Sequence, residues 1–394
     1  MEWKEYNICQ LCDTISETYK GKSNSVVLIN TSDVLEGKVL NHKRVPNKGL
    51  KGQFKKTFKK NDILYSEIRP ANKRFAYINF SPNDYIASTK LMVLRSKPIV
   101  SSHFLFQILK SEIVLKNLQM LAESRSGTFP QITYSELSNV RVKVPPLPVQ
   151  DKIVGILSAL DSKIENNNKI NANLEAQAEA LFKSWFVDFT PFKDQPFVDS
   201  ELGPIPQGWK VGKLGDIALQ STEKVLTRND VKVLSPITTG KLVLSEEYFT
   251  KQVFSKSIRN YKIVKQGAFA YNPARVNIGS LGMNEFKFDG CVSPVYVVFE
   301  CLKGYSFFFD LFRKTEFFKQ AVISFAIGGV RQTLNYSDFA LIDVTIPPQN
   351  IVQSFNEIYL HLKKKISINE EENQRLAALR DTLLPKLMSG EIKL

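Results

Sequence analysis

A long apolar stripe at helical spacing follows Pro148. Its positions recur at alternating steps of four and three, and two of them are asparagines rather than apolar residues. The series is Ile153, Leu157, Leu160, Ile164, Asn167, Asn171, Leu174, Ala178, Leu181 and Trp185. Because a repeat of about 3.5 residues keeps one seam of a helix facing a partner, this pattern predicts a long helix in a coiled coil.

The same stripe returns near the end of the chain. Adding 202 to each number gives Phe355, Tyr359, Leu362, Ile366, Asn369, Asn373, Leu376, Arg380, Leu383 and Leu387, in which Arg380 is the one poor match. Asparagines in a seam lower stability but fix register, so their matched positions favour two helices that pack on each other. The alternative is two unrelated helices, each packed on its own domain. Pro385 is expected to end or kink the second helix near Leu384.

The helices close two copies of one longer unit. The repeated segments are Trp3-Lys4 and Trp209-Lys210, 65–69 and 271–275, 131–136 and 332–338, and 144–146 and 346–348. A period of about half the chain indicates a duplicated domain, since solenoid repeats are roughly 20 to 50 residues long.

Proline-rich segments separate the parts of the chain. Residues 144–148 and 346–348 form extended entries to the two helices, and six prolines and glycines between 190 and 208 indicate a linker. The first helix is expected to end by about Phe189. The predicted order is a globular domain over 1–146, a helix over 147–189, the linker over 190–208, a second domain over 209–346 and a helix over 347–394.

Each globular domain mixes two kinds of pattern. Residues 91–94 and 295–299 are apolar runs typical of buried strands, whereas 103–122 and 307–322 have the periodicity of amphipathic helices. The predicted class is therefore mixed α/β, with two similar globular domains in one duplicated chain.

The charge of the chain indicates its partner. A formal net charge of +14 and a pI near 9.4 favour a polyanion, with nucleic acid first and an anionic membrane surface second. Some proteins are basic without such a partner. The chain starts without the apolar core of a signal peptide, no apolar run approaches a membrane span, and four cysteines do not suggest a disulfide framework. A cytoplasmic protein is expected.

A basic segment between Asn41 and Asn61 is the first candidate DNA contact. It contains no acidic residue, Phe54 and Phe58 interleave with its cations, and its lysines and arginine could neutralise phosphates. The cations are Lys43, Arg44, Lys48, Lys51, Lys55, Lys56, Lys59 and Lys60, of which the first three are the chosen candidates. The alternative is a solvated basic loop.

Two further clusters carry side chains that can read base edges. Arginine suits guanine, and asparagine or glutamine suits adenine, while small residues let a backbone approach a ligand. The candidates are Arg69, Asn72, Lys73, Arg74, Arg125, Ser126, Thr128 and Gln131 in the first copy, and Arg259, Asn272, Arg275, Asn277, Gly329, Arg331 and Gln332 in the second. The alternative for each is a surface turn that only shapes the fold.

Catalytic signatures are missing from the sequence. It has neither a phosphate-cradling Gly-x-x-x-x-Gly-Lys loop nor a strand followed by Gly-x-Gly-x-x-Gly, and its three histidines are far apart. Asn272–Arg275 lacks the second proline and the aromatic of the adenine methyltransferase motif. Cys9 and Cys12 have zinc spacing, but a buried or incidental cysteine is favoured because no second pair accompanies them. No catalytic or metal site is expected.

Ordered motifs along the whole chain resemble one family. They are Gly203-Pro-Ile-Pro-Gln-Gly-Trp209, Leu214-Gly-Asp-Ile217, Val144-Pro-Pro-Leu-Pro-Val-Gln150, Ala180-Leu-Phe-Lys-Ser-Trp-Phe-Val-Asp-Phe189 and Leu383-Leu-Pro-Lys-Leu-Met-Ser-Gly-Glu-Ile392. In this order, and duplicated, they resemble the specificity subunits of type I restriction–modification enzymes.

The resemblance implies a role for each part. Each globular domain would be a target recognition domain that reads one half of a bipartite site in double-stranded DNA. The two helices would pack as an antiparallel coiled coil that separates the domains. A helix of about 35 residues is about 50 Å long, which matches the scale of the roughly 34 Å between successive major-groove half-sites.

The resemblance also implies partners. Two methyltransferase subunits would dock on the helices, and two restriction/translocase subunits would complete the enzyme. S-adenosylmethionine, ATP and magnesium would bind those partners, and this chain would bind no cofactor. The alternatives are a stand-alone DNA-binding protein, a structural coiled-coil adaptor and a stand-alone methyltransferase.

Overall fold

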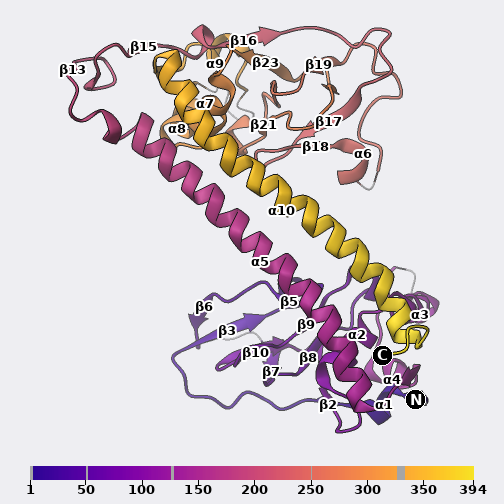
Figure 1. The fold of residues 1–394 in the computed structure, drawn as a ribbon. Coiled ribbons are helices and arrows are strands. Elements are labelled where there is room, and N and C mark those ends of the chain that lie inside the picture. The colour runs from indigo at the N-terminus through magenta and orange to yellow at the C-terminus, as the bar shows by residue number, and fades with distance from the viewer. Residues whose placement is uncertain (1–2, 50–51, 126–127, 250, 326–332) are drawn as a thin grey trace. The chain divides into compact units, whose positions relative to one another are not determined.

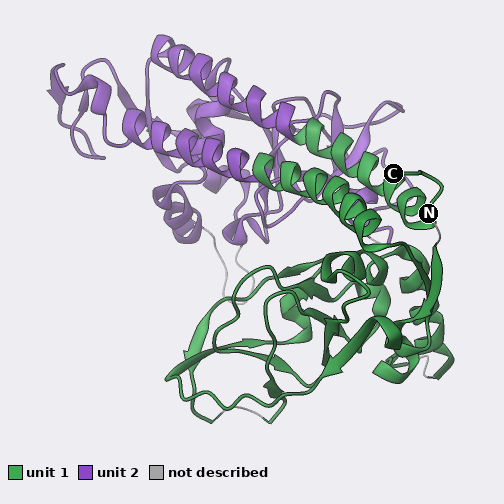
Figure 2. Ribbon diagram, turned by 60° about the horizontal axis from the view of Figure 1, so that its bottom comes forward, with its two compact units in different colours: residues 1–167, 370–394 green, residues 168–369 purple. Residues whose placement is uncertain are grey.

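The chain folds into two compact units. The computed structural model describes residues 3–49, 52–125, 128–249, 251–325 and 333–394 (Figure 1). The first unit is Met1–Asn167 together with Glu370–Leu394, and the second is Asn168–Asn369 (Figure 2). Both units contain strands and helices, so the predicted mixed α/β class is confirmed.

Two four-stranded sheets and a layer of helices make up the first unit. The first sheet has the order β6 (Arg44–Pro46), β3 (Ser25–Ile29), β10 (Tyr85–Ser88), β7 (Phe54–Lys56), and the second has β2 (Cys12–Ile15), β11 (Leu91–Ser96), β8 (Ile63–Ser66), β9 (Phe75–Tyr77). One apolar core lies between the sheets, and a larger one joins the second sheet to the helices. β11 confirms the strand predicted at 91–94.

The second unit repeats this topology. Its sheets have the orders β18 (Leu242–Leu244), β17 (Lys232–Pro236), β22 (Gly290–Val292), β19 (Lys262–Val264) and β16 (Ala218–Ser221), β23 (Val297–Cys301), β20 (Phe269–Tyr271), β21 (Leu281–Met283). Parallel pairs occupy the same place in both units, β3 with β10 and β17 with β22. The repeat extends to individual hydrogen bonds. The hydroxyl of Tyr134 donates to the carbonyl of Cys12 at 2.6 Å, and the hydroxyl of Tyr336 donates to the carbonyl of Ala218 at 2.7 Å.

A short antiparallel pair closes each unit before its long helix. β1 (Lys4–Asn7) pairs with β12 (Arg141–Val144), and β15 (Lys210–Lys213) pairs with β24 (Asp343–Ile346). The smaller elements are α1 (Ile8–Leu11), β4 (Val34–Leu35), β5 (Lys38–Val39), α4 (Tyr134–Ser138), β13 (Phe197–Val198), β14 (Ile205–Pro206), α6 (Ser245–Tyr248) and α9 (Tyr336–Phe339). Residues 190–208, predicted as a linker, contribute Phe192 and Ile205 to the core of the second unit.

Each predicted domain helix is divided in two. Residues 103–122 fall in α2 (Ser102–Leu109) and α3 (Glu112–Arg125), and residues 307–322 fall in α7 (Tyr305–Phe312) and α8 (Glu316–Phe325). A side-chain hydroxyl caps the N-terminus of the second helix of each pair. The hydroxyl of Ser111 accepts from the amide of Val114, and the hydroxyl of Thr315 accepts from the amide of Phe318. The strand predicted at 295–299 begins at Val297, and Val295 is exposed.

The two long helices are α5 (Leu147–Phe186) and α10 (Gln349–Ser389), and each contributes to both units. Pro385 was expected to end or kink the second helix, and it does not end it, since α10 continues through it to Ser389. Leu383, Leu384 and Leu387 pack on the core of the first unit there, and that burial offsets a proline cost of about 3 kcal/mol. No helix in the described part of the chain is long and apolar enough to span a membrane.

Candidate nucleic-acid interface

The four seam asparagines contact one another between the long helices. In the first unit, the amide of Asn167 donates to Asn373 at 3.0 Å and to Glu372 at 2.7 Å. In the second unit, the amide of Asn369 donates to Asn171 at 2.7 Å. In the first unit Asp161 and Asn167 of α5 contact Arg380 and Asn373 of α10, respectively. In the second unit Asn171 and Phe182 of α5 contact Asn369 and Phe355 of α10, respectively. The helices therefore run antiparallel within each unit, and the coiled-coil packing in the predicted fold is confirmed.

The rest of the seam is covered. None of the predicted pairing positions is exposed: Ile153, Leu157, Phe355, Tyr359 and Ile366 are buried, and Leu160, Ile164, Leu174, Leu181, Leu362, Leu376 and Leu383 are half-buried. The poor match at Arg380 has a local explanation. Its guanidinium donates to the carboxylate of Asp161 on α5 at 2.9 Å, so an ion pair replaces an apolar contact at this level of the first unit.

Two loops that were predicted separately come together in the first unit. Ile68 forms an antiparallel bridge with Gln131, and the backbone amide of Arg69 donates to the carbonyl of Pro130 at 3.0 Å. The guanidinium of Arg69 reaches across to the carbonyl of Thr128 at 3.2 Å. The loop after β8 and the loop before α4 therefore form one surface, called here the loop pair, which consists of residues 67–74 and 128–133.

The first loop of the pair has a strained backbone. Arg69 and Lys73 have φ of 44° and 53°, and they flank a 3-10 turn at Pro70–Asn72. Non-glycine residues are uncommon in this left-handed region, and they persist where surrounding contacts fix them. Here the side chain of Gln119 on α3 accepts from the amide of Ala71 at 3.0 Å. The turn exposes the side chains of Arg69 and Asn72.

Lys73 and Arg74 are engaged within the protein. The ammonium of Lys73 lies 3.3 Å from Glu112, and the guanidinium of Arg74 donates to the carbonyls of Ser32 at 3.1 Å and Val34 at 3.3 Å. Both side chains are half-buried. Arg74 therefore holds backbone in place through one nitrogen of its guanidinium, and its contact with DNA stays a prediction.

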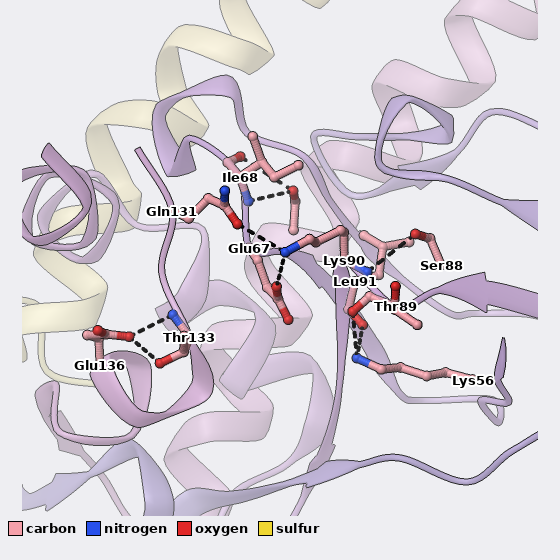
Figure 3. A network of polar contacts seen from close by, with 11 residues as sticks. Lys56, Glu67, Ile68, Ser88, Thr89, Lys90, Leu91, Gln131, Thr133 and Glu136 are labelled. Atoms are coloured by element: carbon pink, nitrogen blue, oxygen red, sulfur yellow. Dashed lines mark hydrogen bonds and ion pairs between the residues drawn. The ribbon is translucent and has the colours of Figure 1, made fainter. Parts of the chain in front are cut away.

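A polar network underlies the second loop of the pair (Figure 3). Gln131 accepts from the ammonium of Lys90 at 3.1 Å, and the same ammonium lies 3.5 Å from Glu67. Arg125 pairs with Glu136. The hydrogen bond from the Thr133 side chain is the main cause that holds the pKa of the Glu136 carboxyl below its usual range. Burial opposes this lowering, and backbone hydrogen bonds and the charge of Arg125 add to it. Ser126 lies outside the described residues.

The second unit contains a matching loop after β20. The amide of Leu334 donates to the carbonyl of Pro273 at 3.1 Å, as that of Ile132 does to Glu67 at 2.8 Å. Asn272 caps the turn by accepting from the amide of Ala274 at 3.0 Å. Arg275 and Asn277 are exposed on this loop, and Arg259 is exposed elsewhere in the unit. Gly329, Arg331 and Gln332 lie outside the described residues.

A glycine is required at the end of this second-unit loop. Gly279 has φ of 92°, and a Cβ there would lie 2.6 Å from the carbonyl oxygen of Thr238. The close approach holds the loop against residues between β17 and β18, so the exposed side chains of Arg275 and Asn277 stand on a fixed turn.

The basic segment at 41–61 has more structure than a solvated loop. It contributes β6 and β7 to the first sheet, and Phe58 is buried in the core between the sheets. Arg44 donates to the carbonyl of Ser25 at 3.1 Å and lies 3.8 Å from Asp84. Lys43 and Lys48 are exposed, which is the arrangement that phosphate contact requires. Lys51 lies outside the described residues.

The two cysteines with zinc spacing lie in different environments. Cys12 is buried in the core, and burial raises the pKa of its thiol to about 12, whereas Cys9 is exposed. In the ranges that the structure describes, no three His, Cys, Asp or Glu side chains gather as metal ligands would. Lys90 was not predicted, and Lys56 was named only as one cation of the basic segment. The fold brings Lys90 to Gln131 of the loop pair and Lys56 to the carbonyl of Leu91.

Sequence comparison relates this chain to named proteins. Residues 1–176 match a family described as the type I restriction modification DNA specificity domain. The type I restriction enzyme HindI specificity subunit of Haemophilus influenzae is 30% identical, over 99% of this chain and 100% of its own length. The MjaIX specificity subunit of Methanocaldococcus jannaschii is 28% identical, over 89% of this chain and 82% of its own length.

Structural comparison shows a shared fold. The type I restriction–modification S subunit from M. genitalium aligns with a TM-score of 0.55 at 16% identity, over 98% of this chain and 96% of that chain. A chain from a structure of type I R-M complex assembly and conformational transition aligns with a TM-score of 0.51, also at 16% identity, over 99% of this chain and 98% of that chain.

Proposed function

Since this chain belongs to the family of type I restriction enzyme specificity subunits, we propose that each of its units reads one half of a bipartite site in double-stranded DNA. The observation that carries this proposal is the equivalent loop that follows β8 in the first unit and β20 in the second. Both units support a loop after the equivalent strand, β8 or β20, with an equivalent backbone bond, from Ile132 to Glu67 and from Leu334 to Pro273.

Different side chains on equivalent loops support two different half-sites. The first unit exposes Arg69 and Asn72, and the second exposes Arg275 and Asn277. Guanidinium and amide groups recognise base edges in the major groove by paired hydrogen bonds. Because the scaffolds match and the exposed groups differ in position, the two halves of the site would differ in sequence. Lys43 and Lys48 would contact phosphates, which position a protein without reading bases.

The long helices would set the spacing of the half-sites and hold partner subunits. α5 and α10 each contribute residues to both units, and the asparagine pairs fix their antiparallel register. A duplicated chain offers two equivalent docking positions, which suits two copies of a methyltransferase subunit. Two restriction/translocase subunits would complete the nuclease.

The chemistry would take place on those partners. This chain would supply DNA recognition and positioning without catalysis, while the partners would bind S-adenosylmethionine, ATP and magnesium. The adenine to be methylated must leave the base stack, so the specificity subunit would hold the DNA while the base enters a methyltransferase pocket. The complex would act in the cytoplasm, where the DNA is.

Co-purification and DNA binding test this proposal. The chain is expressed with the methyltransferase subunit encoded beside it, and the complex is titrated into labelled duplex DNA over a range of salt concentrations. We expect a stable complex whose affinity falls steeply with salt. A chain that stays apart from the methyltransferase and binds one site alone with full selectivity would instead be a stand-alone DNA-binding protein.

A further inference from the structure

Each unit contains a partly buried lysine bound to backbone carbonyls. The ammonium of Lys56 donates to the carbonyls of Thr89 at 3.0 Å and Leu91 at 2.8 Å (Figure 3). The ammonium of Lys262 donates to the carbonyl of Tyr296 at 2.7 Å. Both lysines therefore hold the turn that leads into the central strand of a sheet, β11 in the first unit and β23 in the second.

Strand register shows that the two lysines are equivalent. Lys56 on β7 pairs with Ala87 on β10, and Lys262 on β19 pairs with Val292 on β22. Each also forms an isolated bridge on its other side, with Thr18 and Lys224. The same residue type thus occupies the same position in two units whose other loop residues differ.

This arrangement costs free energy, which suggests that the turn matters. Burial lowers the pKa of both lysines, because a less hydrated ammonium is harder to charge. An apolar side chain at either strand position would avoid that penalty. In the first unit the ammonium instead fixes the two carbonyls on either side of Lys90, and in the second unit it fixes the carbonyl of Tyr296, the residue after Val295.

In each unit, an exposed residue of the turn lies opposite the loop that follows β8 or β20. In the first unit this residue is Lys90, which lies opposite Glu67 and contacts both Glu67 and Gln131. In the second unit β20 and β23 pair Tyr271 with Val297, so continuing that register places Val295 opposite Pro273. Val295 is 72% exposed, a large fraction for an apolar residue in the turn before a strand.

We propose that Lys90 and Val295 read a base at the equivalent position of the two half-sites, with Lys56 and Lys262 as the residues that position them. The proposal rests on the DNA-reading function proposed above. The ammonium of Lys90 has three donors, two of which suffice for Glu67 and Gln131, and donors suit the O6 and N7 acceptors of guanine. The methyl groups of Val295 suit the C5 methyl of thymine.

Exchange of the two residue types is the first test. Lys90→Val and Val295→Lys are each assembled with the methyltransferase subunit, and methylation rates are compared on duplexes that vary one base pair at a time. Lys143→Val on β12 and Leu219→Lys on β16 repeat the same chemical changes on exposed strand positions away from the turn. Each variant should lose roughly 5- to 150-fold discrimination at one base pair of one half-site, and the controls none.

Three results of this test would be distinct. Unchanged base preference in both variants, with a wild type that methylates a bipartite site, would overturn the inference and leave the proposed function intact. A uniform loss of rate on every duplex would place Lys90 on a phosphate and would equally overturn it. Failure of the wild type to methylate any sequence, while bound to its partner, would count against the proposed function itself.

The positioning lysines need a readout other than stability. Lys56→Met should weaken the base preference at the same base pair as Lys90→Val, and Lys262→Met at the same base pair as Val295→Lys. Combining the two substitutions of one unit in a double variant should have little further effect on that preference. Loss of thermal stability with unchanged base preference would limit these lysines to a structural role. Because Lys90 and Val295 are exposed, their variants remain informative if a buried-lysine variant does not fold.

Discussion

The side-chain amide of Asn369 on α10 donates to the Oδ1 of Asn171 on α5 at 2.7 Å. Both side chains are buried, with 3% and 9% of their surface exposed. The bond therefore satisfies two polar groups that cannot easily reach water, and only one register of the helices allows it.

Removing one member of this pair should destabilise the second unit. Asn171→Leu leaves the amide of Asn369 buried without that acceptor, at a cost of about 1–3 kcal/mol. The double variant Asn171→Leu/Asn369→Leu should recover most of the loss, because neither polar group remains. Thermal unfolding of both, with the exposed Asn166→Leu as control, measures this. Equal stability of single and double variants would show that the pair does not hold the register.

A buried charge cluster should make the second unit sensitive to acid. Asp310 is 4% exposed, its carboxylate accepts from Arg313 at 2.6 Å and from the hydroxyl of Tyr359 at 3.2 Å, and the latter lies on α10. Burial opposes ionisation, but Arg313 and then Lys363 hold the pKa of Asp310 below its usual range. Asp310→Asn should cost about 3–5 kcal/mol because Arg313 loses its counter-charge.

The pH dependence of that cost has a definite sign. A carboxyl whose pKa is lowered by folding stabilises the protein above its unfolded pKa and loses this contribution as the pH falls through the folded value. The difference in the free energy of unfolding between wild type and Asp310→Asn should therefore be the same at about pH 7 and about pH 5. It should shrink below about pH 4. Urea unfolding at these pH values measures it. A difference that grew on acidification would contradict the assignment.

Arg275 and Arg74 should behave differently, although both were predicted to read bases. Arg275 is exposed on its loop, so Arg275→Ala should reduce the discrimination between bases at one position of one half-site by about 1–3 kcal/mol. The same variant should leave the stability of the protein unchanged. Arg74 donates to two carbonyls, so Arg74→Ala should lower the melting temperature. Competition binding with single-base variants and thermal unfolding separate the two. Unchanged selectivity at both halves would remove Arg275 from the interface.

Lys43 and Lys48 should contribute affinity without selectivity. If each contacts one phosphate, Lys43→Gln or Lys48→Gln should reduce the slope of log affinity against log salt by about 0.9. The reduction should be the same on cognate and unrelated DNA. Lys152→Gln, an exposed change on α5, serves as the control. A slope unchanged in both variants would place the basic segment away from DNA.

Local periodicity predicted the long helices well, because a seven-residue pattern reports directly on which side of a helix is covered. It could not predict that Asp161 accepts from Arg380, since that contact joins residues 219 positions apart. The breaks at Lys110 and Arg313 were also missed. Each break is a short polar run between apolar residues, Lys110–Glu112 or Arg313–Glu316, of a kind that also occurs within amphipathic helices, and the capping hydroxyls of Ser111 and Thr315 mark the restart.

Long-range placement limited the prediction of the site in the same way. Arg69 and Gln131 were chosen from separate motifs, and the fold brings them to one surface. Lys56 was one cation among eight in a basic segment, and nothing local distinguishes it from its exposed neighbours. Its role depends on carbonyls more than 30 residues away in sequence.

Mapping of methylated adenine tests the central claim most directly. The chain is expressed with its neighbouring methyltransferase subunit in a host free of DNA methylation, and N6-methyladenine is located by single-molecule sequencing. The account predicts one bipartite motif, with two specified halves around an unspecified gap of fixed length. A continuous motif, or methylation without sequence preference by a soluble and intact complex, would contradict it.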